Sequence, residues 1–301
     1  MATGARFERH GRFCLYETGR QVSVHWWYQW RPSAQESEVT ASPRDTEPVF
    51  TNDSSPLITS SVHDGVLRLS LNRPDKKNAL TLGMYEVLID HITDADRDDA
   101  VSVLMIRGEG GNFTAGNDLQ DFLQNPPVDE SAPVFRFMYA LSMFKKPLVA
   151  AVDGVAVGIG TTMLLHCDLV YAAPDARFMT PFVNLGLNPE AGSSYLLPLL
   201  AGYHRAAGLL MLGEPFSAVK AKQIGLVNEI VTVSTVDDYA LRQAHKLASR
   251  PQASLMLTKR LLKEGHVEMI QKTISKEALI LIDRLGSPEA KAAFEAILKR
   301  K

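Results

Sequence analysis

The chain has 301 residues, of which 46% are hydrophobic and 22% are charged, and its formal net charge at pH 7 is -2. This length and composition suffice for a hydrophobic core, in one large domain or two smaller ones. A net charge this small excludes a broad basic field of the kind that attracts nucleic acid or an anionic membrane. Any anionic ligand must therefore be held by local groups.

The two cysteines, Cys14 and Cys167, lie far apart in the sequence. This pattern fits neither a disulfide framework nor a thiolate metal site, so we expect a reducing compartment and no metal. No run approaches the roughly 18 apolar residues of a membrane-spanning helix, and the N-terminus lacks the apolar core of a secretory signal. We expect an intracellular protein, cytoplasmic or, in a eukaryote, mitochondrial or peroxisomal, with no membrane span.

Residues 1–56 differ from the rest of the chain. They hold all three tryptophans, followed by a polar run without periodicity. A polar segment of this kind cannot offset the entropy lost on ordering. We therefore predict an N-terminal extension without fixed structure over residues 1–56.

Strands and helices alternate from residue 57 onward. Strict alternation of apolar residues over 66–71 predicts a half-buried strand that opens the domain, and apolar residues at helical spacing after Thr81 predict an amphipathic helix. This order predicts an α/β fold with a largely parallel sheet, in a core of residues 57–250. Further predicted strands are 101–106, 148–152 and 169–172, and further predicted helices are 134–145 and 161–166.

The pattern becomes almost entirely helical from Ala191 onward. Helices of this kind usually cap a core or join subunits, and residues 251–301 are predicted to form a helical region of their own. The predicted helices are 236–249, 252–263, 267–285 and 288–299.

Two glycine-bearing segments, 110–119 and 152–160, each follow a predicted strand and lead into a predicted helix. At such a turn the backbone N–H groups can point at a ligand, and open α/β sheets bind their ligands there. Glycine turns are also common as plain connections, so neither segment alone specifies a site.

A third segment, 180–194, carries Glu190 just before a predicted apolar helix. A glutamate in that position is an ordinary stabilising choice, because the N-terminal end of a helix favours negative charge. The same carboxylate is also suited to acid/base chemistry. The residues themselves leave both interpretations open.

Together the three segments resemble the crotonase, or enoyl-CoA hydratase/isomerase, superfamily over about residues 57–301. The resemblance implies a spiral core of ββα units and a helical C-terminal region that builds trimers, often paired into hexamers. It rests on four ordered motifs: Asn72-Arg73-Pro74 with Asn78-Ala79-Leu80, Ala115-Gly116-x-Asp118-Leu119, the turn 154–160 followed by Cys167-Asp168, and the segment around Pro189.

The resemblance implies an oxyanion hole made by the backbone N–H groups of Ala115 and Ile159. Removal of a C2 proton from an acyl-CoA places negative charge on the thioester oxygen, and preorganised N–H donors stabilise that charge. The substrate would be an acyl-CoA thioester, and the chemistry needs no separate cofactor.

The acids narrow the choice within the family. Hydratases of the family use two glutamates, and the matching positions here are Thr162 and Phe182, neither of which is an acid or base near pH 7. The setting of Glu190 and Asn117 resembles the peroxisomal-type Δ3,Δ2-enoyl-CoA isomerases of fatty acid β-oxidation. That resemblance implies that Glu190 moves a proton from C2 to C4 while Asn117 orients it, although an asparagine there also suits a helix cap.

The resemblance also implies residues that contact the substrate. Arg73, Lys76 and Lys77 flank a turn similar to the loop on the adenine side of CoA, although exposed lysines are usually just solvated. Lys259 and Lys263 are further candidates on a C-terminal helix. The other expected contacts are Ala79, Leu80, Asp118, Leu119, Phe182 and Leu187.

Two alternatives stay open at this point. One is a crotonase-fold enzyme with a different outcome, such as an enoyl-CoA hydratase that uses Glu190 alone or an acyl-CoA hydrolase. The other is a non-catalytic acyl-CoA-binding module, against which the presence of Glu190 argues.

Overall fold

The computed structural model describes residues 6–8, 12–17, 20–23, 57–232 and 234–299. The chain divides into two compact units, Met1–Thr51 and Asn52–Lys301. In the first unit three strands that we did not expect form an antiparallel sheet: β1 (Arg6–Glu8), β2 (Arg12–Glu17) and β3 (Arg20–Ser23). The other residues of the predicted extension lie outside the described ones, so its lack of fixed structure stays a prediction.

A six-stranded sheet forms the centre of the second unit, in the order β12-β9-β7-β6-β5-β4. All neighbouring pairs are parallel except the β4–β5 hairpin, which confirms a largely parallel sheet. The domain opens with β4 and not, as expected, with β5. The strands are β4 (Ile58–His63), β5 (Val66–Leu71), β6 (Val103–Gly108), β7 (Leu148–Val152), β9 (Leu169–Ala172) and β12 (Glu229–Ile230).

A second sheet holds three short strands in the order β11-β10-β8. The chain passes from β7 of the large sheet to β8 of the small one, and again from β9 to β10, which gives the spiral arrangement of ββα units. The two-residue strands β11 and β12 interrupt the almost entirely helical pattern expected after Ala191. The small sheet comprises β8 (Val155–Val157), β10 (Arg177–Met179) and β11 (Phe216–Ser217).

Strand β5 is buried on both faces, so the prediction of a half-buried strand is wrong. Leu67, Leu69 and Leu71 face the main core, as the alternation indicates. On the other side Val66 packs in a smaller apolar cluster beneath helix α8 (Val236–Ala248). The charged residue of that face, Arg68, pairs with a carboxylate of α8, which lets its side chain lie under a helix.

The helices begin largely where their capping residues predict. Thr81 accepts a hydrogen bond from the Met84 N–H at 3.3 Å and starts α1. The predicted helix 161–166 is instead a short α4 followed by the 3-10 helix η2. The helices before α8 are α1 (Leu82–Arg97), α2 (Leu119–Gln124), α3 (Pro133–Met143), α4 (Ile159–Thr162), η2 (Met163–His166), α5 (Ser193–Ala201), α6 (Tyr203–Leu212) and α7 (Ala218–Gln223); η1 (Pro74–Lys76) and η3 (Val183–Leu185) are single 3-10 turns.

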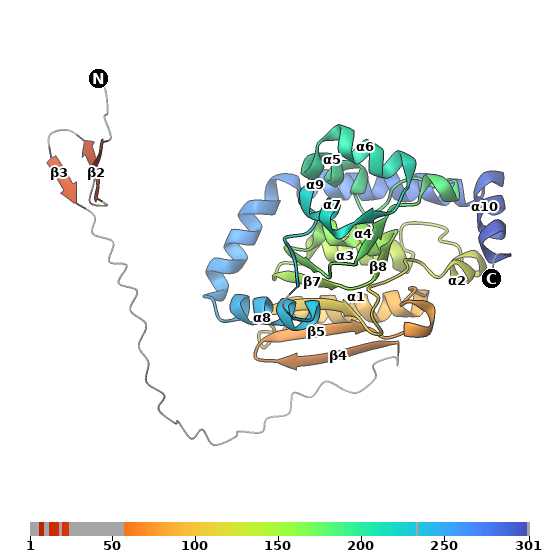
Figure 1. The fold of residues 1–301 in the computed structure, drawn as a ribbon, viewed down its shortest axis with the longest axis horizontal. Coiled ribbons are helices and arrows are strands. Elements are labelled where there is room, and N and C mark those ends of the chain that lie inside the picture. Colours follow the sequence, from red (N-terminus) through yellow and green to blue (C-terminus); the bar gives the residue numbers. More distant parts are fainter. Residues whose placement is uncertain (1–5, 9–11, 18–19, 24–56, 233, 300–301) are drawn as a thin grey trace, which may run out of the picture. The chain divides into compact units, whose positions relative to one another are not determined.

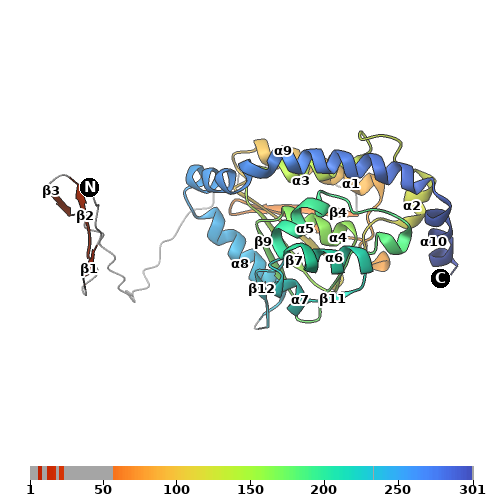
Figure 2. The same ribbon diagram turned by 90° about the horizontal axis from the view of Figure 1, so that it is seen from above.

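One helix, α9 (Gln252–Leu285), replaces the two that the sequence predicts over 252–263 and 267–285. A glycine at position 265 costs a helix only about 1 kcal/mol, which the packing of Ile270 and Ile274 in the main core offsets. Helix α9 runs over α3 and leads to α10 (Pro288–Leu298), which lies beside α2 at one end of the unit (Figures 1 and 2). The C-terminal helices thereby close one end of the core.

Candidate active site

The first two glycine segments lie side by side at the carboxyl ends of β6 and β7. The Phe113 N–H donates to the Asp153 carbonyl at 2.7 Å, and the Thr114 N–H donates to the Val155 carbonyl at 2.9 Å. The Val157 N–H returns a bond of 3.0 Å to the Thr114 carbonyl. These bonds tie the two loops into one unit.

Glycine is required where the two loops touch. Gly116 has φ +87°, and a Cβ there would lie 2.6 Å from the Val157 carbonyl oxygen. A Cβ on Gly160 would lie 2.6 Å from the Thr114 Cγ2. Both contacts are too short for any side chain, so only glycine permits this approach of the two backbones.

Two backbone N–H groups of these loops, those of Asn117 and Ile159, have no acceptor among the described residues. Asn117 forms a parallel bridge with Leu80, whose bonds are made by the flanking Gly116 and Asp118, so the N–H of Asn117 points to the opposite side. Ile159 is the first residue of α4, where an N–H has no partner within the helix. Both residues line the same cavity.

The Ala115 N–H is not free, contrary to expectation. It donates to the Lys77 carbonyl at 2.9 Å. The expectation that Ala115 supplies a donor to a thioester oxygen is therefore wrong, because the turn before α1 already uses that group. In the same loop the N–H of Asn117 has no such partner.

Glu190 lies in a turn and not in the first turn of a helix. Helix α5 begins at Ser193, with Gly192 as its N-cap, so an ordinary helix-stabilising role for Glu190 is excluded. Ala191 and Gly192 have φ +58° and +72°, which reverse the chain directly after the glutamate. The Glu190 side chain is 3% exposed, and its Oε1 has no hydrogen-bond partner among the described residues.

Burial raises the pKa of Glu190 to about 8, and the nearby Glu277 carboxylate adds to the rise. A carboxyl group normally titrates near pH 4, so this environment moves its proton affinity into the neutral range. Such a group can take up and return a proton near neutral pH.

Tyr85, a fully buried residue of α1, donates a hydrogen bond from its hydroxyl to the Asn117 Oδ1. Burial, and after it the charge of Glu190, raises the pKa of Tyr85 well above its usual value, so the phenol keeps its proton. The bond directs the carboxamide oxygen of Asn117 toward Tyr85. Helix α2 is capped instead by Asp118, whose carboxylate accepts from two N–H groups, so Asn117 is not the helix cap.

An inner cavity of about 470 Å³ brings Asn117, Ile159 and Glu190 together. Among the described residues Glu190 is the only ionisable side chain that lines it. The expected residues Phe182 and Leu187 also line this cavity. The rest of its wall is largely apolar and includes Phe122 of α2, Leu185 of η3, Leu281 of α9 and Phe294 of α10.

An outer cavity, also of about 470 Å³, shares Ala115, Asn117 and Leu119 with the inner one. Its wall is more polar and includes the expected residues Arg73, Lys76, Lys77, Ala79 and Asp118. The two cavities therefore adjoin: one is largely apolar and lined by Glu190, and the other is lined by three cationic and two acidic side chains.

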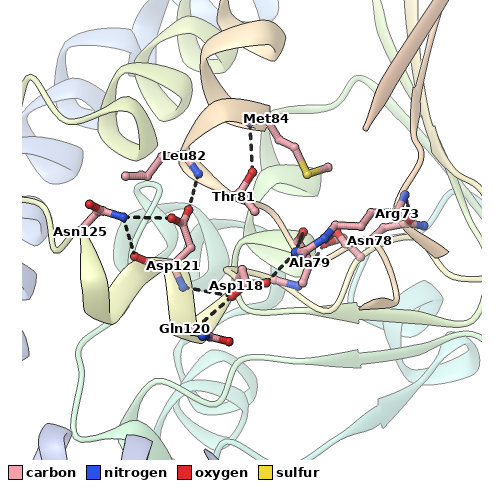
Figure 3. Close-up of polar contacts among 12 residues, drawn as sticks. Arg73, Asn78, Ala79, Thr81, Leu82, Met84, Asp118, Gln120, Asp121 and Asn125 are labelled. Atoms are coloured by element: carbon pink, nitrogen blue, oxygen red, sulfur yellow. Dashed lines mark hydrogen bonds and ion pairs between the residues drawn. The ribbon is translucent and has the colours of Figure 1, made fainter. Parts of the chain in front are cut away.

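The cations of the outer cavity differ in availability. Arg73 donates to the Asp118 Oδ2 at 2.6 Å and to the Ala79 carbonyl at 3.1 Å (Figure 3), so its charge is neutralised within the protein. Lys76 and Lys77 form no ion pair with the described residues. The two lysines are thus the groups free to meet an anion.

Other expected residues lie elsewhere. Leu80 is 2% exposed and lines neither cavity, so it supports Asn117 through its backbone and is not placed to touch a ligand. Thr162 is buried, and its hydroxyl donates to the Gly158 carbonyl at 3.3 Å. The Nζ atoms of Lys259 and Lys263 lie 2.7 and 3.4 Å from the carboxylate of Asp168, and neither residue lines the inner or the outer cavity of its own chain, so their contact with CoA stays a prediction.

We did not expect two residues of this site, Tyr85 and Glu277. Tyr85 lies on the apolar face of α1, where an aromatic residue is typical of a core. Glu277 lies on the buried face of α9 between Ile274 and Leu281. A charged residue inside an apolar stripe is the one signal that pointed to it.

Among the described residues no three His, Cys, Asp or Glu side chains gather as a metal site would require. Within the same residues, no helix combines the length and apolar character needed to cross a membrane.

The fold and the site define a mixed α/β protein of the crotonase fold with a helical C-terminal region. Residues 61–295 match the enoyl-CoA hydratase/isomerase family, and the chain belongs to that family.

Individual relatives support the same assignment. The chain is 36% identical over 251 residues to enoyl-CoA delta isomerase 2 of Rattus norvegicus. The matched region is 81% of this chain but only 63% of the rat protein. The chain is 36% identical over 227 residues to 1,2-epoxyphenylacetyl-CoA isomerase of Escherichia coli (strain K12), covering 73% of this chain and 87% of that protein. The solved structure of OdaA from Pseudomonas aeruginosa is similar with a TM-score of 0.79 at 46% identity, covering 81% of this chain and 99% of that one. The names of these relatives describe more than one reaction, so they assign the family and not a single reaction.

Proposed function

We propose that this protein is a Δ3,Δ2-enoyl-CoA isomerase, which converts 3-enoyl-CoA to 2-trans-enoyl-CoA in the β-oxidation of unsaturated fatty acids. The observation that carries the proposal is the inner cavity, where Glu190 is the only ionisable side chain among the described residues and the free N–H groups of Asn117 and Ile159 line the same wall. The similarity to enoyl-CoA delta isomerase 2 supports it.

The reaction consists of two proton transfers through one carboxylate. Ionised Glu190 takes a proton from C2, and the electron pair moves through the thioester carbonyl, whose oxygen becomes negative. The N–H groups of Asn117 and Ile159 stabilise that oxygen. Asn117 thus takes the donor role that the family resemblance implies for Ala115. Protonated Glu190 then returns the proton to C4, so that the double bond moves from C3–C4 to C2–C3.

The apolar wall suits this chemistry. Phe182 stands where a hydratase of the family carries a glutamate, and it lines the cavity with other apolar side chains. A wall of this kind gives a water molecule few partners, which disfavours hydration of the product and quenching of the dienolate. The reaction consumes no water and changes no oxidation state, so it requires no cofactor.

We infer that the outer cavity receives the CoA part of the substrate. Lys76 and Lys77 offer two ammonium groups to phosphate oxygens, while Leu119 joins the two cavities. Arg73 and Asp118 act on the shape of this cavity, because their charges are paired with each other.

We further infer that the chain assembles as a homotrimer or a dimer of trimers. Large apolar side chains lie exposed on the helices after residue 190, where a single copy leaves them in water. They include Leu199, Tyr203, Met211, Leu212, Leu261 and Leu262.

Product analysis of the purified protein tests the proposed reaction. We expect conversion of 3-enoyl-CoA to 2-enoyl-CoA without a gain in mass, and a loss of at least about a hundredfold in kcat for Glu190→Gln. Glu86→Gln, an equal change at the half-exposed pair with Arg136, is the control and should keep the parent rate. Addition of water to 2-enoyl-CoA as the main reaction would show a hydratase, and release of free CoA would show a hydrolase.

A further inference from the structure

We propose that Glu277 of α9 is a positioning residue for Glu190. Its carboxylate holds the turn that carries the acid/base group and keeps a second negative charge beside it. This inference rests on the proposed function, because it assigns Glu190 the proton transfer.

Glu277 holds the turn on both sides of Glu190. The Gly192 N–H donates to the Glu277 Oε2 at 2.6 Å, and the Ser194 N–H donates to Oε1 at 2.9 Å. Before the glutamate, the Asn188 side-chain amide donates to the backbone carbonyl of Glu277 at 3.1 Å. One residue of α9 therefore fixes the chain both before and after Glu190.

The turn needs such a clamp. Ala191 adopts φ +58°, a left-handed conformation that is unfavourable for a residue with a Cβ. Helix α5 follows at once, and its first N–H groups would be left without acceptors at a buried helix end. Glu277 accepts from two of the N–H groups at this junction and so stabilises both the turn and the start of the helix.

The buried position of Glu277 requires a compensating role. The residue is 5% exposed and lies on the face of α9 that carries Ile274, Ala278 and Leu281. A carboxylate there is costly unless it is hydrogen-bonded. Burial raises the pKa of Glu277, and the N–H bonds that both of its oxygens accept offset part of that rise by favouring the ionised form.

Glu277 also determines the electrostatic surroundings of Glu190. Tyr85, on α1, stays protonated because burial raises its pKa. His166, on η2, contacts the Ala191 carbonyl at 2.8 Å, and burial lowers its pKa to about 4, so it is neutral near pH 7. Of these neighbours Glu277 alone brings a charge, and that charge opposes ionisation of Glu190.

The test is the pH dependence of kcat/KM for 3-enoyl-CoA in the full chain and in Glu277→Gln. The parent requires ionised Glu190, so kcat/KM rises with pH and levels off above about 8. In Glu277→Gln the lost charge moves the midpoint down by about one pH unit. The plateau kcat falls at least about tenfold, with KM within about threefold, because one acceptor oxygen replaces two.

Two further variants separate the effect of the hydrogen bonds that hold the turn from the effect of the negative charge. Glu277→Asp keeps the charge but shortens the reach, so its midpoint should stay near that of the parent while the plateau kcat falls. Glu268→Gln makes the same glutamate-to-glutamine change on the same helix, at a side chain that is 84% exposed. It should change neither the midpoint nor the plateau kcat. If Glu277→Gln does not fold, the plateau kcat of Glu277→Asp decides whether Glu277 positions Glu190.

The proposal would be overturned if the midpoint in Glu277→Gln did not move. It would also be overturned if the plateau kcat of either Glu277 variant equalled that of Glu268→Gln. The infrared band of the protonated Glu190 carboxyl, assigned by its loss in Glu190→Gln, gives the same midpoint without substrate. If the parent converts no 3-enoyl-CoA, the proposed function fails, and the infrared midpoint still decides the role of Glu277.

Discussion

Asn117 serves the proposed site through two different groups. Its backbone N–H is free and lines the inner cavity, while its carboxamide oxygen accepts from the Tyr85 hydroxyl. The carboxamide nitrogen consequently points away from Tyr85 and can act as a donor on the cavity side. Tyr85 thereby sets which end of the amide faces the substrate or Glu190.

Replacement of Tyr85 by phenylalanine tests this role. The ring keeps its packing against Phe137, whose centroid lies 5.2 Å away, so the protein should fold with little loss of stability. Without the hydroxyl the amide is free to flip, and we expect kcat to fall about tenfold with KM within about threefold. Tyr139→Phe, which removes a hydroxyl bonded to Glu130 at a residue that lines neither cavity, is the matched control. Equal kcat values in the two variants would contradict the role of Tyr85.

At this scale the sequence indicates residue types better than individual groups. The acid of the third glycine segment does line the inner cavity. The donor expected at Ala115 is wrong because its N–H is used by Lys77, a residue of another turn. Periodicity and motif spacing carry no information on which backbone group of a loop is already bonded, since that depends on contacts far apart in the chain.

At the scale of elements, Asn78 connects the turn before α1 to the first glycine loop. Its Nδ2 donates to the carbonyls of Glu109 and Asn112 at 2.8 and 2.7 Å, and its Oδ1 accepts from the Arg73 N–H at 2.8 Å. The Thr114 hydroxyl adds a bond of 2.6 Å to the Asn78 carbonyl. The side chain is fully buried, so water does not replace these partners.

We expect Asn78→Ala to destabilise the protein by about 2 to 4 kcal/mol, because it leaves buried carbonyl groups without donors. Its φ of +56° adds to the loss, since asparagine tolerates this conformation better than alanine. Denaturant unfolding measures the change. Asn125→Ala, at the exposed end of α2, is the control, and a similar loss in both variants would argue against the connecting role of Asn78.

Long periodic elements were predictable and short ones were not. The strands β5 and β7 and the helix α1 follow from their apolar spacing. The strands β11 and β12 have two residues each, too few for any period to show. Their pairing depends on β10 and β9, which come earlier in the chain, so local sequence does not specify them.

At the scale of the whole molecule, the inner cavity is assembled from segments distant in sequence. Its wall combines the two glycine loops, the turn before α5, and the helices α2, α9 and α10. The ends of α2 and α10 lie together in both views (Figures 1 and 2). The sequence predicted the class of fold and a ligand at the strand ends, but the closure of the cavity by C-terminal helices follows from tertiary packing alone.

This closed apolar setting makes the fate of the transferred proton the most direct measurement of the central claim. We would convert 3-enoyl-CoA labelled with deuterium at C2 in ordinary water and locate the label in the product. If a single carboxylate serves as base and then as acid, deuterium should appear at C4 of the product. In Glu190→Gln both the reaction and this transfer should be lost. If the new hydrogen at C4 came from water in every turnover, one carboxylate would not be carrying the proton and the account would be wrong.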